Sequence, residues 1–231
     1  TLSSSSAASD VYKRQGTAYR SKEGKIVKNP KRTAAKKLDD LPRPDWSLFD
    51  INKYFDKTID LSFGDDEEDE KIILPVSTAR GCAFRCTFCH FVFWDDPYRY
   101  RSAESIVDEV RSNIEQYGVT NVSFFDDLTF AGLGQTEKLL DAILDSGLKF
   151  KWTGAIRYDL FGQGRSSYEK RLNIAKKMKE SGCTGVGFSL ESGDEEILKM
   201  MNKKVTNENF EESVSILREA GIASHTSVVF G

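Results

Sequence analysis

The sequence predicts an α/β fold and, within that class, a partial, TIM-like (β/α) barrel of about five βα units. Two observations lead to this prediction. From residue 71 onward, short apolar runs alternate with amphipathic segments of helical period. A glycine closes each helical segment, at Gly118, Gly147, Gly182 and Gly221, where a left-handed helix end is expected. Repeated units of this kind place parallel strands side by side in sequence order.

The strands are expected where apolar residues run together over short stretches, at 72–77, 122–125, 150–155, 186–190 and 223–230. Runs without a polar face are typical of parallel strands that are covered by helices. We therefore expect the sheet to lie beneath the amphipathic segments that connect its strands.

The helices are expected at 103–117, 136–146, 168–181 and 207–220. In the first of them Ile106, Val110 and Ile114 recur at helical spacing and mark a buried stripe. Ser102 and Thr206 stand directly before two of these segments and are suited to act as N-caps.

Composition indicates a globular chain without a dedicated nucleic-acid surface. Its 231 residues are 39% hydrophobic, enough for one ordinary core, and the net charge is −3, from 33 basic and 36 acidic residues. No apolar run approaches the roughly 18 residues that span a membrane. We expect a small-molecule or tethered substrate, no nucleic-acid partner and no membrane segment. The acidic run at 65–70 lacks the spacing of a calcium loop and is expected to be a solvated loop.

The first seventy residues do not show the βα pattern. Residues 1–15 resemble the in-frame translation of a sequencing-library adaptor, and we exclude them from the fold. Residues 16–70 are charged and turn-rich, with a possible hairpin at 22–30 and an extended turn at 41–46, and are expected to form a linker. The catalytic or binding core is therefore expected at 71–231.

Three cysteines lie within eight residues, directly after the first predicted strand. Cys82, Cys86 and Cys89 follow Gly81, which frees the backbone, so their thiolates can converge on one soft centre. Structural zinc needs four ligands, and the nearby candidate, His90, adjoins Cys89 too closely for easy joint coordination. An iron–sulfur cluster held by three cysteines leaves one iron open to a small molecule. The chain has only one other cysteine, so a disulfide framework is not expected; reduced thiols imply a reducing compartment, the cytoplasm.

Polar residues follow the other predicted strands at the points where they end. Asp126 and Asp127 follow the second strand, Arg157 ends the third, and Glu191 and Ser192 follow the fourth. Such folds place their chemistry at the carboxyl ends of the strands. We therefore expect these side chains to surround the cysteines.

The spacing Cys-x3-Cys-x2-Cys, with the aromatic Phe88 directly before the last cysteine, resembles the signature of the radical S-adenosylmethionine (radical SAM) enzymes. The resemblance is strongest over 78–230. It implies a partial barrel of the radical SAM type and a [4Fe–4S] cluster on Cys82, Cys86 and Cys89. The open iron would chelate the methionine part of S-adenosylmethionine, with Phe88 near the adenine.

The same resemblance implies roles for the strand-end residues. Asp126 or Asp127 would contact the amino group of the cofactor, Arg157 the cofactor carboxylate or Glu191, and Glu191 with Ser192 the ribose region. Each has a plainer alternative: a turn cap for the two aspartates, a surface salt bridge for Arg157 and a salt-bridged strand end for Glu191.

Residues 16–46 are similar to the bridge between a cobalamin-binding domain and a radical SAM core. The chain is therefore expected to be a fragment of a longer protein, with that domain upstream and a further βα unit downstream. An electron donor such as flavodoxin or ferredoxin is the implied partner. The alternative function is a non-catalytic zinc- or iron–sulfur-bearing binding module. Cys183 is expected to be a small buried hydrophobe, His225 a packed or substrate-side residue, and 91–94 a shield for the cluster.

Overall fold

The structure is a computed structural model that describes residues 16–31, 33–51, 53, 71–89, 97–162, 164 and 166–230. The chain divides into two compact units, residues 1–36 and 37–231. The first contains an antiparallel hairpin of β1 (Ala18–Arg20) and β2 (Ile26–Lys28), with Gly24 at a φ of 79° in its turn. The turn requires a left-handed residue there, which explains the glycine.

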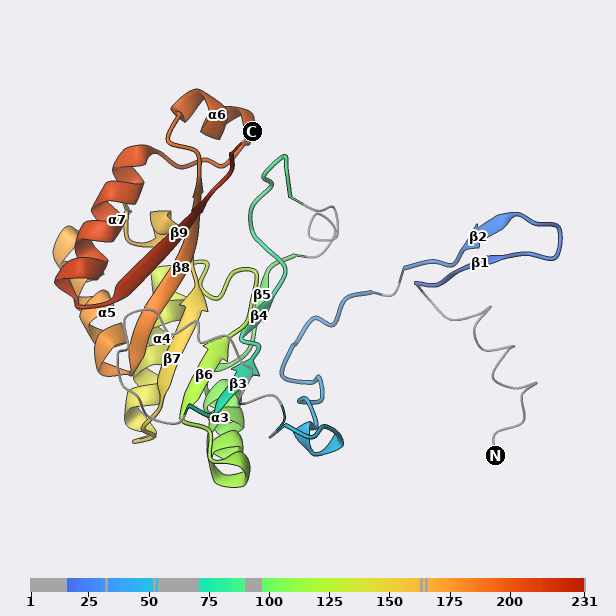
Figure 1. Ribbon diagram of the computed structural model, residues 1–231, viewed down its shortest axis with the longest axis horizontal. Coiled ribbons are helices and arrows are strands. Elements are labelled where there is room, and N and C mark those ends of the chain that lie inside the picture. The colour runs from blue at the N-terminus through green and yellow to red at the C-terminus, as the bar shows by residue number, and fades with distance from the viewer. Residues whose placement is uncertain are drawn as a thin grey trace. The chain divides into compact units, whose positions relative to one another are not determined.

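The second unit is built on a five-stranded parallel sheet in the order β3-β6-β7-β8-β9 (Figure 1). Its strands are β3 (Ile73–Val76), β6 (Asn121–Phe124), β7 (Lys151–Ala155), β8 (Cys183–Glu191) and β9 (Ala223–Val228). Each strand pairs in parallel with the next one in the sheet. This arrangement confirms the α/β class and the sequential strand order that the repeating units predict.

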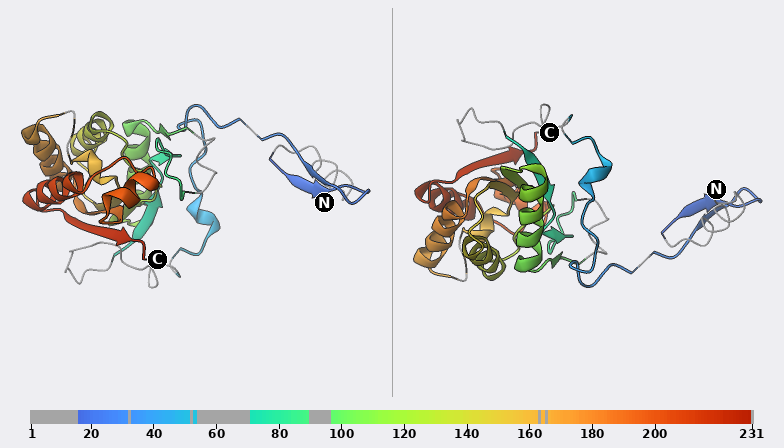
Figure 2. Two further views of the ribbon diagram at one scale, coloured as in Figure 1. Left: turned by 90° about the horizontal axis from the view of Figure 1, so that it is seen from above. Right: turned by 90° about the horizontal axis from the view of Figure 1, so that it is seen from below.

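Helices connect the strands and cover one face of the sheet (Figure 2). The covering helices are α3 (Ala103–Tyr117), α4 (Leu133–Asp145), α5 (Tyr168–Glu180) and α7 (Asn207–Glu219). The short α6 (Glu195–Met200) follows β8 and lies beyond the end of that strand (Figure 1). Ser102 caps α3 by accepting a hydrogen bond from the Ser105 N–H, and Thr206 forms a capping box with Asn209. Both predicted N-caps are confirmed.

The predicted helix-ending glycines all adopt left-handed backbone conformations. The φ values are 68° at Gly118, 68° at Gly147, 100° at Gly182 and 72° at Gly221. Gly182 is also sterically required, because a Cβ there would lie 2.1 Å from the carbonyl oxygen of Phe150.

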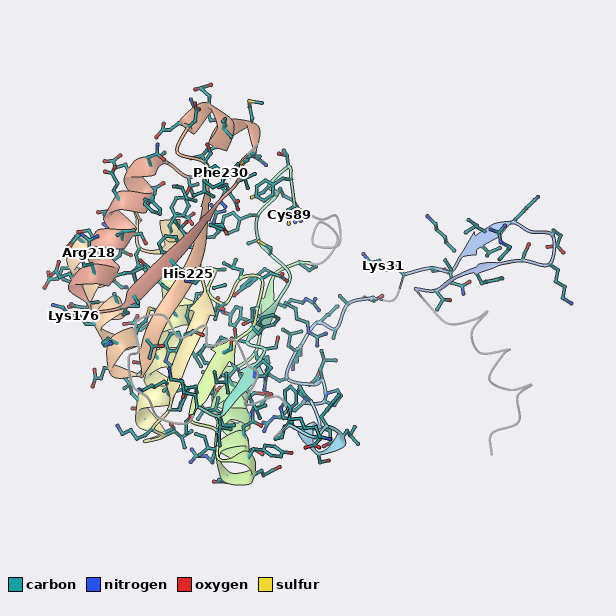
Figure 3. The ribbon with its side chains drawn as sticks, in the orientation of Figure 1. Lys31, Cys89, Lys176, Arg218, His225 and Phe230 are labelled. Carbon is teal, nitrogen blue, oxygen red and sulfur yellow. The ribbon has the colours of Figure 1, made fainter. Side chains whose placement is uncertain are left out.

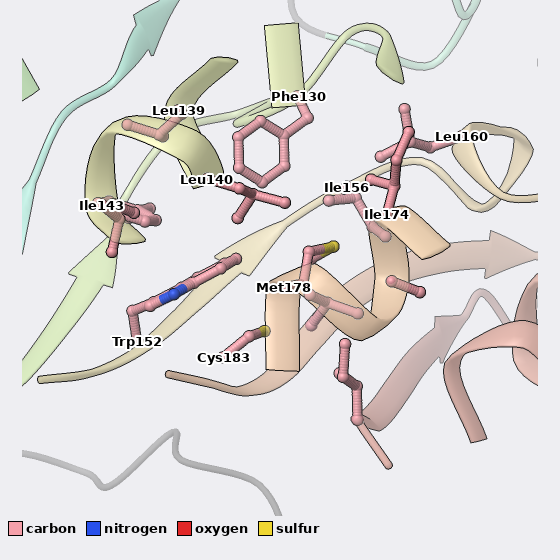
Figure 4. Close-up of a cluster of buried hydrophobic side chains, with 14 of the residues drawn as sticks. Phe130, Leu139, Leu140, Ile143, Trp152, Ile156, Leu160, Ile174, Met178 and Cys183 are labelled. Carbon is pink, nitrogen blue, oxygen red and sulfur yellow. The ribbon is translucent and has the colours of Figure 1, made fainter. Parts of the chain in front are cut away.

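The main core lies between the sheet and the helices. Alternate strand residues such as Val76, Phe124 and Trp152 point into it and are almost completely buried. Cys183 belongs to this core, and Figure 4 shows it near Trp152 and Met178. Burial raises the pKa of the Cys183 thiol, so it stays neutral and packs as a small hydrophobe, as the sequence predicts.

Element boundaries differ from the predicted ones where the apolar signal is weak. The helix expected at 136 begins at Leu133, and the strand expected at 186 begins at Cys183. In both places glycines interrupt the hydrophobic pattern from which the boundary was predicted. In the folded chain, packing extends the helix and pairing with β7 extends the strand. The sequence also did not predict the small antiparallel pair of β4 (Ala79–Arg80) and β5 (Arg99–Tyr100), which follows β3.

Residues 37–48 pack on the start of α3. Leu38 is buried, the Asp39 carboxylate accepts a hydrogen bond from the Ser102 N–H at 3.0 Å, and Trp46 contacts the core. Part of the segment expected to be a linker therefore belongs to the folded unit. In the portion of the chain that the structure describes, no helix is long and apolar enough to cross a membrane.

Candidate functional site

The three clustered cysteines lie on a loop, residues 81–89, that follows β4; we call it the cysteine loop. Gly81 opens it with a φ of 76°, and Cys82, Cys86 and Cys89 are all half-buried and outside any disulfide. The Cys89 N–H donates to the Cys86 carbonyl oxygen at 3.1 Å and forms a turn. The loop lies at the end of the sheet toward which the strand arrows point, where Cys89 is labelled (Figure 3).

The three thiols do not converge on a single point in this structure. Among the described residues, no group of three or more His, Cys, Asp or Glu side chains is close enough to hold a metal ion. Three thiols on one short glycine-led loop nevertheless have the chemistry that an iron–sulfur cluster requires. His90, residues 91–94 and the acidic run at 65–70 lie outside the described residues.

The cysteine loop is anchored to the turn that follows α6. The Thr87 N–H donates to the Met201 carbonyl oxygen at 2.9 Å, and the Thr87 hydroxyl donates to that of Met200 at 3.2 Å. The Asn202 side-chain amide donates to the Arg85 carbonyl oxygen at 2.7 Å. These bonds come from residues between the cysteines, so the loop is held in place without using its thiols.

Arg157 connects the end of β7 to the same loop. Its guanidinium lies 3.6 Å from the centroid of the Phe84 ring, a stacked cation–π contact. It forms a forked pair with Asp159, at 2.9 and 3.3 Å, and donates to the Lys203 carbonyl oxygen at 2.8 Å. The charged partner of Arg157 is therefore Asp159 and not Glu191, which was one of the two expected partners.

Glu191 forms a buried ion pair with Lys203. The Lys203 Nζ donates to Glu191 Oε1 at 2.8 Å, and the two side chains are only 7% and 11% exposed. The same ammonium lies 5.7 Å from the ring centroid of Phe88, which is half-exposed on the cysteine loop. Lys203 was not among the residues expected at the site. A Lys-Lys pair usually indicates an exposed surface, so the sequence offered little reason to expect a buried lysine here. The available indication was that Lys203 and the apolar Val205 are two residues apart, and both are buried.

The backbone around this ion pair is unusual. Among the described residues, the non-glycine residues with positive φ are Glu191 at 67°, Asn202 at 52° and Lys204 at 56°. All three belong to the end of β8 or to the turn that anchors the cysteine loop. Such conformations cost free energy and are concentrated at functional sites.

The two aspartates after β6 have different environments. The Asp126 carboxylate accepts hydrogen bonds from the Ser77 hydroxyl, from the Thr78 N–H and hydroxyl, and from the Ala79 N–H, at 2.6–3.1 Å. Asp126 therefore fixes the chain between β3 and β4. Burial raises its pKa, against the opposing effect of these hydrogen bonds. Asp127 is exposed, so of the two it offers the open carboxylate.

Ser192 follows Glu191 and takes part in a local turn. Its hydroxyl oxygen accepts a hydrogen bond from the Asp194 N–H at 3.1 Å, and Asp194 in turn caps α6. Ser192 is half-buried and directly follows Glu191 in the chain.

The face of the sheet opposite the helices is lined by small and polar residues. Ser123, Thr153, Gly185, Gly187 and His225 border a cavity of about 190 Å³ on this face. A Cβ on Gly187 would lie 2.5 Å from His225 Cε1, so the glycine makes room for the imidazole. A packed barrel carries bulky branched side chains at such positions. The small side chains at these positions leave the cavity unfilled, although Phe124 and Phe125 also contribute to its lining.

These features can be compared with known proteins. The profile of the Radical SAM superfamily matches residues 76–231, from the last residue of β3 onward. The chain belongs to the Radical SAM superfamily. The matched range includes the whole cysteine loop and all five predicted strand ends.

Individual relatives agree with this assignment. An uncharacterized methyltransferase of Pyrococcus horikoshii is 27% identical over 94% of this chain and 42% of its own length. An anaerobic magnesium-protoporphyrin IX monomethyl ester cyclase of Rubrivivax gelatinosus is 26% identical, over 94% of this chain and 36% of its own length. The structure of OxsB, a cobalamin-dependent radical enzyme with aqua-cobalamin and S-adenosylmethionine bound, has a TM-score of 0.75 and 19% identity. It matches 94% of this chain and 30% of that protein, and it shows a shared fold.

The chain thus spans well under half the length of these relatives. It shares with them the core that carries the cysteine loop.

Proposed function

We propose that this chain carries the catalytic core of an enzyme that uses a [4Fe–4S] cluster to cleave S-adenosylmethionine reductively. The bound, reduced cluster would supply the electron that splits the cofactor into methionine and a 5′-deoxyadenosyl radical, which takes hydrogen from a substrate. The observation that carries the proposal is the anchored loop with three thiols at the carboxyl ends of five parallel strands.

Cys82, Cys86 and Cys89 would hold the cluster, and the turn after α6 would keep their loop in place. Phe88 is half-exposed and available to cover the adenine. Arg157 would act through Phe84 as a positioning residue, since its guanidinium is already occupied by Asp159 and by a backbone carbonyl.

The cofactor's polar groups would meet four residues. Lys203 uses one hydrogen bond on Glu191 and retains ammonium donors for the cofactor carboxylate. Asp127 offers an exposed carboxylate to the amino group, and Glu191 with Ser192 would accept hydrogen bonds from the ribose. Binding would replace part of the water around these charges and strengthen their interaction with the cofactor.

We extend the proposal to cobalamin-dependent methyl transfer or rearrangement as the net reaction. It is supported by the methyltransferase among the relatives and by the cobalamin-dependent enzyme with the shared fold. The substrate would be a small or tethered molecule, and the electron would come from a donor such as flavodoxin or ferredoxin. Because the thiols must stay reduced, we place the enzyme in the cytoplasm.

The test uses the chain purified without oxygen, loaded with iron and sulfide, and reduced with dithionite. S-adenosylmethionine should change the electron paramagnetic resonance spectrum of the reduced cluster and should yield methionine and 5′-deoxyadenosine. Lys203→Met should weaken cofactor binding by about tenfold, the equivalent of one charge-assisted hydrogen bond.

Two results would contradict the proposal. One is zinc in the protein without iron or sulfide, which would favour a structural zinc module. The other is a stable cluster whose spectrum does not respond to S-adenosylmethionine, which would favour a non-catalytic iron–sulfur module. Lys177→Met serves as a matched control, because this lysine pairs with Asp141 on the helical layer, remote from the cysteine loop. It should bind the cofactor like the wild type.

A further inference from the structure

Cys86 is the middle cysteine of the loop, and the backbone on both sides of it is bound to the turn after α6. The Arg85 carbonyl oxygen, in the peptide that precedes Cys86, accepts a hydrogen bond from the Asn202 side-chain amide at 2.7 Å. The Thr87 N–H, in the peptide that follows Cys86, donates to the Met201 carbonyl oxygen at 2.9 Å. The two bonds restrict the backbone rotations at Cys86, which set the direction of its side chain.

The same turn also controls the position of Cys89. The Cys89 N–H donates to the Cys86 carbonyl oxygen at 3.1 Å, so the backbone at Cys89 takes its position from Cys86. Between the two cysteines, the Thr87 hydroxyl donates to the Met200 carbonyl oxygen at 3.2 Å. The turn therefore positions two of the three cysteines through bonds in which no thiol takes part.

The backbone at Asn202 indicates why an asparagine stands there. Its φ is 52°, in the left-handed region where glycine has no steric cost and asparagine is tolerated better than most residues. A glycine would fit the turn at least as well, but it has no side chain to reach Arg85. Asn202 combines a left-handed backbone with an amide donor, and the donor binds the peptide beside Cys86. The side chain of Asn202 therefore serves the cysteine loop.

We infer that Asn202 is a positioning residue for the iron–sulfur cluster: its amide fixes Cys86, and through it Cys89, before a cluster binds. The inference rests on the proposed function. The three thiols do not converge on one point, so the loop must adjust when it takes up a cluster. Because the backbone at Cys86 is already held, the loop loses less conformational freedom on binding, and the cluster is bound more tightly.

The experiment compares the wild-type chain with Asn202→Gly, Asn202→Asp and a control, Asn207→Asp. Asn202→Gly keeps the left-handed backbone and removes the amide, so the thermal midpoint of the chain without a cluster should stay close to that of the wild type. Asn202→Asp keeps the shape of the side chain and removes the donor. After anaerobic reconstitution with iron and sulfide, both variants should release iron to a chelator about fivefold faster than the wild type, the equivalent of one hydrogen bond.

Asn207 provides the matched control. Its side-chain amide makes the same kind of bond, to the Gly193 carbonyl oxygen at 2.8 Å, and Gly193 lies outside the cysteine loop. Asn207→Asp should release iron at the wild-type rate. The electron paramagnetic resonance spectrum of the reduced cluster should broaden in Asn202→Gly, because a less restricted loop holds the cluster in several geometries, and should stay unchanged in Asn207→Asp.

Iron release at the wild-type rate in Asn202→Gly, with a cluster present, would overturn this assignment and leave the proposed function intact. An equal acceleration in Asn207→Asp would also overturn it, since the loss of any such amide bond would then have the same effect. A large fall in the thermal midpoint of cluster-free Asn202→Gly would overturn it too, because the amide would then serve the fold as a whole. A chain that binds no iron at all would instead contradict the proposed function, and this inference with it.

Discussion

Glu191 and Lys203 form a buried ion pair at the site. The effect of removing one partner on the free energy of unfolding can be measured apart from its effect on cofactor binding. A buried ion whose partner is removed keeps its desolvation cost without compensation. The pair is nearly inaccessible to solvent, so screening by water is weak. It should therefore matter for folding as well as for the cofactor.

We predict that Lys203→Met lowers the free energy of unfolding by about 3–5 kcal/mol, because the Glu191 carboxylate is left buried and unpaired. The double variant Glu191→Gln with Lys203→Met should recover most of that loss. Urea unfolding of the chain without a cluster measures both. A double variant as unstable as Lys203→Met would show that the packing of the lysine stem, not the charge, is what the fold needs.

Asp126 and Asp127 are neighbours that the structure assigns to different tasks. Asp126→Ala removes the carboxylate that binds Ser77, Thr78 and Ala79, and should cost about 2–4 kcal/mol, since hydrogen bonds to a charged group are worth about 1.5–3 kcal/mol each and do not add fully. Asp127→Ala should change stability by less than about 0.5 kcal/mol and should weaken S-adenosylmethionine binding. Equal stability of the two variants would contradict this division.

At the scale of elements, Asp126 should make the stability of the junction between β3 and β4 depend on pH. Burial raises its pKa, so the folded chain holds this proton to a higher pH than the unfolded chain does. Between the ordinary pKa of an aspartate and the raised value, the stability that this group contributes should fall as pH rises. The difference in unfolding free energy between wild type and Asp126→Asn should shrink over that window. A difference that grows with pH would contradict the raised pKa.

The elements were predictable where several local signals agreed. Helix α3 matches its expected bounds because an apolar stripe, the Ser102 cap and Gly118 all agree. The pair of β4 and β5 was not predictable, because two strands of two residues each are too short to show a periodic pattern and are held together by long-range pairing. In the site, the cysteines were evident from their spacing. Lys203 was not, because its place depends on how the turn after α6 folds back on the cysteine loop. The pairing of Arg157 with Asp159 was not either, because it depends on the 3-10 turn at Tyr158–Leu160, which brings the two side chains together.

For the whole molecule, the division into two units makes a prediction about truncation. Residues 37–231 should unfold with the same free energy as the full chain, because the first 36 residues form a unit of their own. Residues 71–231 should be less stable, because they lack the burial of Leu38, the contact of Trp46 with the core and the hydrogen bond from Ser102 to Asp39. Thermal unfolding of the three proteins tests this. Equal midpoints would show that residues 37–70 add nothing to the fold.

The central claim is that Cys82, Cys86 and Cys89 hold an iron–sulfur cluster and that Cys183, buried in the helical core, does not. The most direct measurement is iron and acid-labile sulfide per chain after anaerobic reconstitution of the wild type, Cys86→Ala and Cys183→Ala. The wild type and Cys183→Ala should each bind about four iron and about four sulfide, as a cubane cluster requires, and Cys86→Ala should bind far less. Equal iron loading in wild type and Cys86→Ala, or zinc in place of iron in the wild type, would contradict the claim.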